Sequence, residues 1–375
     1  MLPVEMKQTQ IEGVYMKYFH GGDVYRNTIQ YDFSVNVNPL GMPPGCMEAA
    51  KQGVELCRQY PDWRGEELCR ALAAAEGVSE KQVILGNGAA ELLYALMFHL
   101  RPKEVLIPVP AFGEYEAAVT ASGGECSFWR LREESDFYLD KAFADAVSEA
   151  TDLVILCNPN NPAGVSVDKD LLLQIAGKCE ETGTWLCVDE CFLPFTEREK
   201  ELTLKHRLEE FPHLIVLRAF TKIYGMPGLR LGYAMTAKAG VLAGIRRCLQ
   251  PWNTSIPAQM AGLQALKVRG FVERTVKLVR EERALMRREL EDMPSGIVEK
   301  VYPSEANFLL LRSRADLYQG MLKQGFLIRD CGNYRGLEGE SGSHTGYFRI
   351  AVRTHQENQA LLECMRRVGR GYAEL

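Results

Sequence analysis

Residues 214–222, Leu-Ile-Val-Leu-Arg-Ala-Phe-Thr-Lys, form a short apolar run that leads into a threonine and a lysine. Comparable runs occur earlier in the chain, and most of them lead through a loop into a helical pattern: Gln82–Leu85, Glu104–Val109, Leu153–Cys157 and Trp185–Val188. Uninterrupted apolar strands with helices between them are typical of a mostly parallel sheet that helices cover on both faces. We therefore predict an α/β fold for this part of the chain.

The chain after Pro257 has a different pattern. Residues Pro257–Asp292, rich in Ala, Leu, Glu and Arg, predict one long helix. Strands around two helices then indicate a smaller α+β domain: Val298–Tyr302, Asn307–Leu311, a helix near Ala315–Gln324, Phe326–Arg329, Tyr347–Val352, and a helix from Gln356. The 375 residues exceed one ordinary core. We expect an N-terminal arm over 1–45 that contributes to the active site and the small domain, a large domain over 46–280 and a small C-terminal domain over 281–375.

Composition argues against several classes of protein. The net charge of −5 gives no general attraction to nucleic acid or to an anionic membrane. No window of about 18 uncharged apolar residues suggests a membrane span, and the first residues lack the apolar run of a signal peptide. The 11 cysteines form no C-x-x-C pair. We therefore expect a reduced, cytoplasmic protein without a disulfide framework or a metal site.

Polar residues follow four of the predicted strands at their C-terminal ends. They are Gly86–Gly88, then Asn158 and Asn161, then Asp189 and Glu190, and last Thr221 and Lys222. Ligands of open α/β sheets bind outside the carboxyl ends of the strands. We therefore expect all four groups to meet in one crevice.

One cofactor would use all of these groups. The small residues from Gly86 to Ala90 let backbone N–H groups approach a phosphate at a helix N-terminus, and Arg230 adds a charge-assisted contact. Asp189 can keep a pyridine nitrogen protonated, Lys222 can form a Schiff base with an aldehyde, and Asn161 can donate to a phenolic oxygen. Together they predict pyridoxal 5'-phosphate (PLP).

Each group alone has a plainer explanation. Gly-Asn-Gly is a common turn, Asp189-Glu190 is compatible with a helix cap or a metal-binding pair, and an isolated Lys222 would be a surface lysine. The order and spacing of the groups favour the cofactor.

Three segments carry a family resemblance: Asn-Pro-Asn-Asn-Pro-Ala-Gly at 158–164, Val-Asp-Glu-Cys-Phe at 188–192, and Thr-Lys-x6-Gly-Leu-Arg-Leu-Gly-Tyr, which starts at residue 221. Over nearly its whole length the chain resembles the fold-type-I, class I and II aminotransferases. The resemblance implies a large domain with a mostly parallel sheet, a smaller C-terminal domain and a homodimer that binds PLP.

The resemblance also implies roles for single residues. Lys222 matches the Schiff-base lysine, Asp189 the partner of the pyridine nitrogen, and Asn161 the donor to the phenolic oxygen. The remaining matches are Gly88, Ala89, Thr221 and Arg230 at the phosphate, Phe112 stacked on the ring, Tyr60 reaching the neighbouring subunit's cofactor, and Arg349 holding the substrate carboxylate.

Other segments resemble L-threonine-O-3-phosphate decarboxylases of cobalamin biosynthesis: His20-Gly21-Gly22-Asp23, Asp32–Gly41, Leu327–Leu337 and Trp252. Phe192 fits as well, because most aminotransferases have a tyrosine there that donates to the phenolic oxygen. This resemblance makes His20, Gly21, Asn36, Asn161 and Arg329 candidates for substrate binding, in addition to Arg349. For Arg329 a planar fork suits phosphate oxygens, while a surface ion pair with Asp330 or Glu338 is the alternative.

The implied reaction is decarboxylation of L-threonine O-3-phosphate to 1-aminopropan-2-ol O-phosphate, or of the serine analogue. The alternative is transamination of histidinol phosphate or an aromatic amino acid. A non-catalytic PLP-binding regulator is disfavoured, because no basic helix-turn-helix segment precedes the enzyme-like region. The sequence departs from the family at Ala219, Ala163 and Asp23, the last of which puts a negative charge near the expected phosphate.

Overall fold

The computed structural model describes residues 20–314, 316–338 and 346–373, and its centre is a seven-stranded sheet. Its order is β2 (Val83–Gly86), β8 (Gly232–Met235), β7 (Leu214–Ala219), β6 (Trp185–Asp189), β5 (Leu153–Cys157), β3 (Glu104–Val109) and β4 (Glu125–Arg130). Every neighbouring pair is parallel except those that involve β8, which is antiparallel to β2 and β7. The prediction of a mostly parallel sheet is confirmed.

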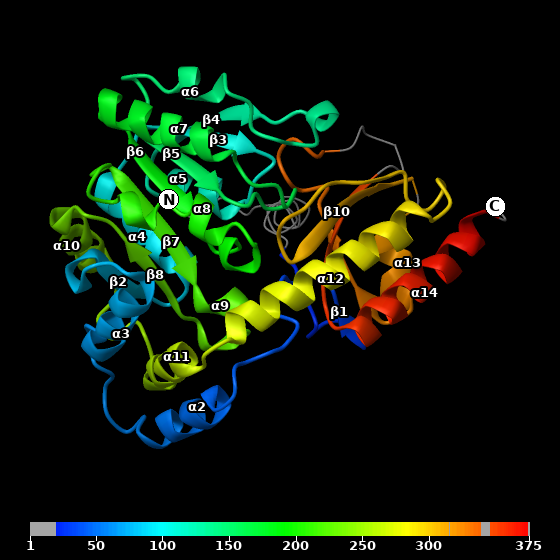
Figure 1. Ribbon diagram of the computed structural model, residues 1–375, viewed down its shortest axis with the longest axis horizontal. Coiled ribbons are helices and arrows are strands. Elements are labelled where there is room, and N and C mark those ends of the chain that lie inside the picture. Colours follow the sequence, from blue (N-terminus) through cyan, green and yellow to red (C-terminus); the bar gives the residue numbers. More distant parts are fainter. Residues whose placement is uncertain (1–19, 315, 339–345, 374–375) are drawn as a thin grey trace, which may run out of the picture.

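Helices cover both faces of this sheet (Figure 1). One face packs on α4 (Ala89–Leu100), α5 (Glu114–Ala121) and α10 (Ala239–Cys248). The other packs on α2 (Cys46–Glu55), α3 (Glu66–Glu76), α6 (Phe143–Ala146), α7 (Lys169–Thr182) and α11 (Ile256–Lys267). The pleat divides each strand between two cores, since Cys187 and Val188 are both buried but belong to opposite faces.

Two strands of the sheet were not predicted. β4 lies at the edge, and its alternating exposed residues give it no continuous apolar run. β8 has only four residues and begins with a glycine. A search for uninterrupted apolar strands misses both patterns.

The C-terminal part contains a four-stranded antiparallel sheet in the order β12 (Arg329–Asp330), β13 (Gly346–Ala351), β10 (Phe308–Ser313) and β9 (Lys300–Val301). It packs with α12 (Phe271–Glu291) and α14 (His355–Ala373) around one apolar core, while α13 (Leu317–Lys323) precedes β11 (Phe326–Leu327). β11 pairs in parallel with β1 (Tyr31–Asp32) from the N-terminal arm.

Three predicted boundaries in this part were wrong. Phe326–Arg329 is not one strand, because the chain leaves β1 after Leu327 and joins β13 at Arg329. Val298–Tyr302 pairs only over Lys300–Val301. The long helix over Pro257–Asp292 is two helices, because Gly270 between them has a left-handed φ of 69°.

Helix α12 runs from beside α9 (Phe220–Ile223) toward β10, and so joins the two parts of the molecule (Figure 1). The division near residue 280 falls within this helix and stays a proposal, as does the arm over 1–45, of which residues 1–19 lie outside the described part. Within the described ranges, no helix has the length and apolarity to cross a membrane.

Candidate active site

Lys222 lies on α9, the short helix that directly follows β7. Its Nζ is 5.9 Å from the ring centroid of Phe192, which is buried and packs edge-on against Phe308. Burial, with a smaller effect of the cations Arg349 and Arg230, lowers the pKa of Lys222 from 10.5 to about 8. The amine of Lys222 is therefore a usable nucleophile close to neutral pH.

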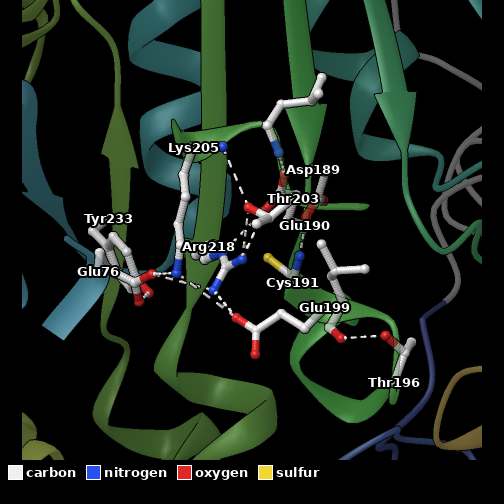
Figure 2. Close-up of polar contacts among 12 residues, drawn as sticks. Glu76, Asp189, Glu190, Cys191, Thr196, Glu199, Thr203, Lys205, Arg218 and Tyr233 are labelled. Carbon is white, nitrogen blue, oxygen red and sulfur yellow. Dashed lines mark hydrogen bonds and ion pairs between the residues drawn. The ribbon is translucent and has the colours of Figure 1, made fainter. Parts of the chain in front are cut away.

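Asp189 ends β6 and is held from two sides. Tyr115 on α5 donates its hydroxyl to Oδ2 at 2.7 Å, and the N–H of Cys191 donates to Oδ1 at 2.9 Å. Burial and the charge of Asp189 raise the pKa of Tyr115 well above its ordinary value, so Tyr115 stays a donor. The prediction that Glu190 shares this crevice was wrong, because consecutive strand residues face opposite sides of a sheet. Glu190 is bound on the other side by Arg218 (Figure 2).

Gly88 and Arg230 form a cradle at the N-terminus of α4. Gly88 has a φ of 84°, and a Cβ there would lie 2.5 Å from Nη2 of Arg230. Only glycine therefore lets the guanidinium lie against the start of the helix, where Ala89 presents its N–H. A helix terminus with an adjacent arginine suits a phosphate. Thr221, 6% exposed, precedes Lys222 on α9.

Arg349 on β13 connects the two parts of the molecule. Its Nη1 donates to Oδ1 of Asn161 and, at 3.3 Å, to the hydroxyl of Tyr334. Its Nη2 donates to the carbonyl oxygen of Ser34 at 2.8 Å. With the amide oxygen of Asn36 turned toward it, that oxygen accepts from Nε at 3.2 Å and from Nη1 at 3.3 Å. The structure thus brings together three residues that the sequence suggested separately: Asn36, Asn161 and Arg349.

Arg329 lies directly opposite Arg349, because the two are paired residues of β12 and β13. Arg329 is 4% exposed, donates to the carbonyl oxygen of Asp330 at 2.6 Å and to the side chain of Asn333 at 2.7 Å, and stacks over Tyr334. The alternative of a surface residue is wrong for this buried guanidinium.

A cavity of about 770 Å³ lies beside Arg329. Its walls include Phe112, Tyr115 and Tyr334, and His20 of the N-terminal arm closes one side. Nε2 of His20 lies 2.9 Å from Oε1 of Glu114, and its ring centroid is 6.0 Å from that of Phe112. The arm reaches this position because Gly21 passes the carbonyl of Ser34 too closely for any Cβ.

Tyr60 lies elsewhere on the surface. Its side chain is 74% exposed and stacks on exposed Trp252 with ring centroids 4.3 Å apart. The contact of Tyr60 with a second subunit stays a prediction.

Sequence reasoning missed three residues of the site. Tyr115 binds Asp189, Tyr334 binds Arg349 and Asn161, and Ser34 binds Arg349 through its carbonyl oxygen. For Tyr115 a signal existed, since it is three residues after Phe112, and the two rings pack edge-on with centroids 5.7 Å apart. A backbone contact such as that of Ser34 leaves no signal in the residue type.

The groups present fit PLP. The cradle of Gly88 and Arg230 suits its phosphate, the carboxylate of Asp189 suits its pyridinium, and the amine of Lys222, whose pKa is lowered to about 8, suits its aldehyde. With this sheet and the small C-terminal part, they define the class of PLP-dependent enzymes of fold type I.

The chain belongs to the family of class I and II aminotransferases, whose family model matches residues 28–365. It is 36% identical over 345 residues to a threonine-phosphate decarboxylase from Salmonella typhimurium, covering 91% of this chain and 92% of that one. It is 31% identical to a histidinol-phosphate aminotransferase from Thermoanaerobacter pseudethanolicus, covering 92% and 95% of the two chains. The crystal structure of a histidinol-phosphate aminotransferase from Clostridium acetobutylicum superposes with a TM-score of 0.82 at 28% identity, covering 91% and 99%.

Proposed function

We propose that this enzyme decarboxylates a phosphorylated amino acid, converting L-threonine O-3-phosphate, or its serine analogue, to the amino-alcohol phosphate. The observation that carries the proposal is the pair of opposed arginines, Arg329 and Arg349, of which Arg329 lines the cavity. The similarity to a threonine-phosphate decarboxylase supports it. A substrate with two anionic groups would use both guanidinium groups.

Arg349 is the proposed partner of the substrate carboxylate. Its contacts to Asn161, Ser34 and Tyr334 fix the plane of the guanidinium before any substrate binds. A guanidinium has five N–H donors in a fixed fork that matches a carboxylate. The residues that hold this guanidinium would therefore determine the orientation of the carboxylate.

Arg329 and His20 are the proposed partners of the phosphate. They line the same cavity and come from β12 and from the N-terminal arm. The imidazole of His20 is held beside the cavity by Glu114, since its Nε2 lies 2.9 Å from Oε1 of that residue. A guanidinium and an imidazole on one cavity would offer N–H donors to a phosphate. Fixing both ends of a substrate determines which of its bonds is oriented to break.

Lys222 and Asp189 are the proposed catalytic residues. When bound, PLP supplies an electron sink beside the substrate's α-carbon. Lys222, with its pKa near 8, is suited to return a proton to that carbon after carbon dioxide leaves. Phe192 lines this position with an apolar ring and no hydroxyl group, so it adds no competing proton donor.

Turnover without an acceptor tests the proposed reaction. A decarboxylase returns a proton to the α-carbon and needs no keto acid, so phosphothreonine alone should give sustained release of carbon dioxide. A single turnover without carbon dioxide, with the cofactor left in its amine form, would overturn the proposal. It would favour transamination instead, the second candidate, which the similarity to histidinol-phosphate aminotransferases supports.

We also propose that the active unit is a homodimer in which Tyr60 reaches the neighbouring site, and that it acts in the cytoplasm. The exposed pair of Tyr60 and Trp252 supports an interface there. Full activity of a species shown to be monomeric by sedimentation would contradict the dimer.

A further inference from the structure

Figure 2 shows a buried ion-pair cluster beside Tyr233. Tyr233 belongs to the core on one face of the sheet, and Tyr115 belongs to the core on the other face. Arg218 of β7, 2% exposed, is at the centre of the cluster. Its guanidinium binds Glu190 at 2.7 Å, Glu199 at 2.7 Å and Glu76 at 3.3 Å. Lys205 binds Glu76 at 2.6 Å, so three carboxylates meet two cations.

The contact between Arg218 and Glu190 fastens the ends of two strands. Glu190 directly follows β6, and its backbone N–H donates to the carbonyl of Leu217 on β7 at 2.9 Å. Arg218 adds two donors to Oε2 of Glu190, at 3.1 Å from Nε and 2.7 Å from Nη2. Thr203 donates to the same oxygen at 2.8 Å. The neighbour of Asp189 is therefore fixed to the strand that leads to Lys222.

The same cluster supports the helix that carries Lys222. Glu76 accepts from the hydroxyl of Tyr233, whose ring packs at 5.8 Å from Phe220, the first residue of α9. Phe220 also stacks on Tyr224 at 4.9 Å, just past the end of α9. The aromatic rings that pack on the two ends of α9 are thus held on one side by the carboxylate that Arg218 binds.

We propose that Arg218 is a positioning residue for the cofactor site, which sets where Lys222 stands relative to Asp189. It touches neither the proposed substrate residues nor Lys222 itself. It acts through Glu190 on one strand and through Glu76, Tyr233 and Phe220 on the other. The inference concerns cofactor binding and holds for either candidate reaction.

The test is the pH dependence of cofactor capture by the apo-protein, without any substrate. The groups that act on Lys222 are Arg349, Arg230, Cys191 and Asp189, and burial is the main cause of its low pKa. Capture by the wild type should be half-maximal near pH 8. Arg218→Lys keeps the charge but loses the fork, so α9 loosens and water returns to Lys222. The midpoint should rise by on the order of half a pH unit.

The control variant is Arg312→Lys, which removes the same fork from a second cluster, formed with Glu133 and Glu299 outside the cofactor site. It should lose stability to urea but keep the wild-type midpoint. An unchanged midpoint in Arg218→Lys, or an equal rise in Arg312→Lys, would overturn the proposal. If Arg218→Lys does not fold, Tyr233→Phe decides. It deletes only the hydroxyl bond to Glu76 and should raise the midpoint less, and no rise would overturn the proposal.

Discussion

Arg218 and Lys222 are cations four positions apart on one segment, in opposite surroundings. Although burial alone would lower it, the carboxylates of Glu76 and Glu190 raise the pKa of Arg218 well above its ordinary value. For Lys222 burial dominates and lowers the pKa to about 8. Within the described ranges, the amine of Lys222 has no hydrogen bond or ion pair to a carboxylate, whereas Arg218 contacts three.

The difference shows that the C-terminal end of β7 both orders the surrounding chain and supplies a nucleophile. A buried cation surrounded by carboxylates keeps its charge and orders the chain around it. A buried cation without such a partner gives up its proton more easily, which costs stability but produces a nucleophile. Arg218 precedes Lys222 in the sequence and belongs to β7. The short helix that carries Lys222 therefore starts from an ordered strand.

The largest effect on stability should come from removing Arg218, the cation that is paired with carboxylates. Arg218→Met leaves Glu190 and its neighbours buried with only Lys205 to compensate them. Removal of one member of a buried ion pair costs about 3–5 kcal/mol of unfolding free energy. Urea denaturation of the apo-protein should show a loss of that size. A loss under about 1 kcal/mol, the range of surface pairs, would mean that the cluster is not a unit.

Removal of a third buried cation, Arg329, should have an intermediate effect, which is measured as a loss of substrate selectivity. Arg329→Ala should raise the KM for phosphothreonine much more than that for threonine. Hydrogen bonds to charged groups are worth about 1.5–3 kcal/mol, so selectivity for the phosphorylated substrate should fall roughly ten- to a hundredfold. Steady-state kinetics with both substrates measure this ratio. Equal losses for the two substrates would contradict a phosphate role for Arg329.

The smallest effect should come from removing the unpaired cation. Lys222→Met abolishes catalysis but should stabilise the apo-protein below pH 8, where the folded state bears the full cost of the buried charge. Between about pH 8 and 10.5 the unfolded state binds more protons, so wild-type stability rises with pH and the advantage of the variant disappears. After allowance for partial exposure, about 1–2 kcal/mol is expected from urea denaturation at pH 7. A destabilised variant at that pH would be the contrary result.

The fold was predictable where burial alone determines the pattern. Five of the seven strands of the large sheet are continuous apolar runs, whereas β4 and β8 are recognisable only from their neighbours. The division of Phe326–Arg329 between two sheets depends on the N-terminal arm, which pairs with β11 from far away in the sequence. The break at Gly270 was open to prediction, since glycine favours a left-handed φ.

The site was predictable where a residue type implies its chemistry. Lys222, Asp189 and Asn161 were proposed because each follows a predicted strand, and Arg230 because it comes eight residues after Lys222 and suits the same phosphate. Tyr115, the partner of Asp189, was missed because its only signal in the sequence is its spacing from Phe112. Glu190 seemed equivalent to Asp189, but it lies on the other face of the sheet and binds Arg218. Arg218 gave no signal, since an arginine within a strand reveals its carboxylates only in three dimensions.

The most direct test of the central claim, that Lys222 is the activated cation, is reductive trapping. The purified holoenzyme is treated with borohydride and digested, and the pyridoxyl group is located by mass spectrometry. The account predicts the adduct on the peptide that contains Lys222, with loss of cofactor absorbance in the visible range. An adduct on any other lysine would contradict it.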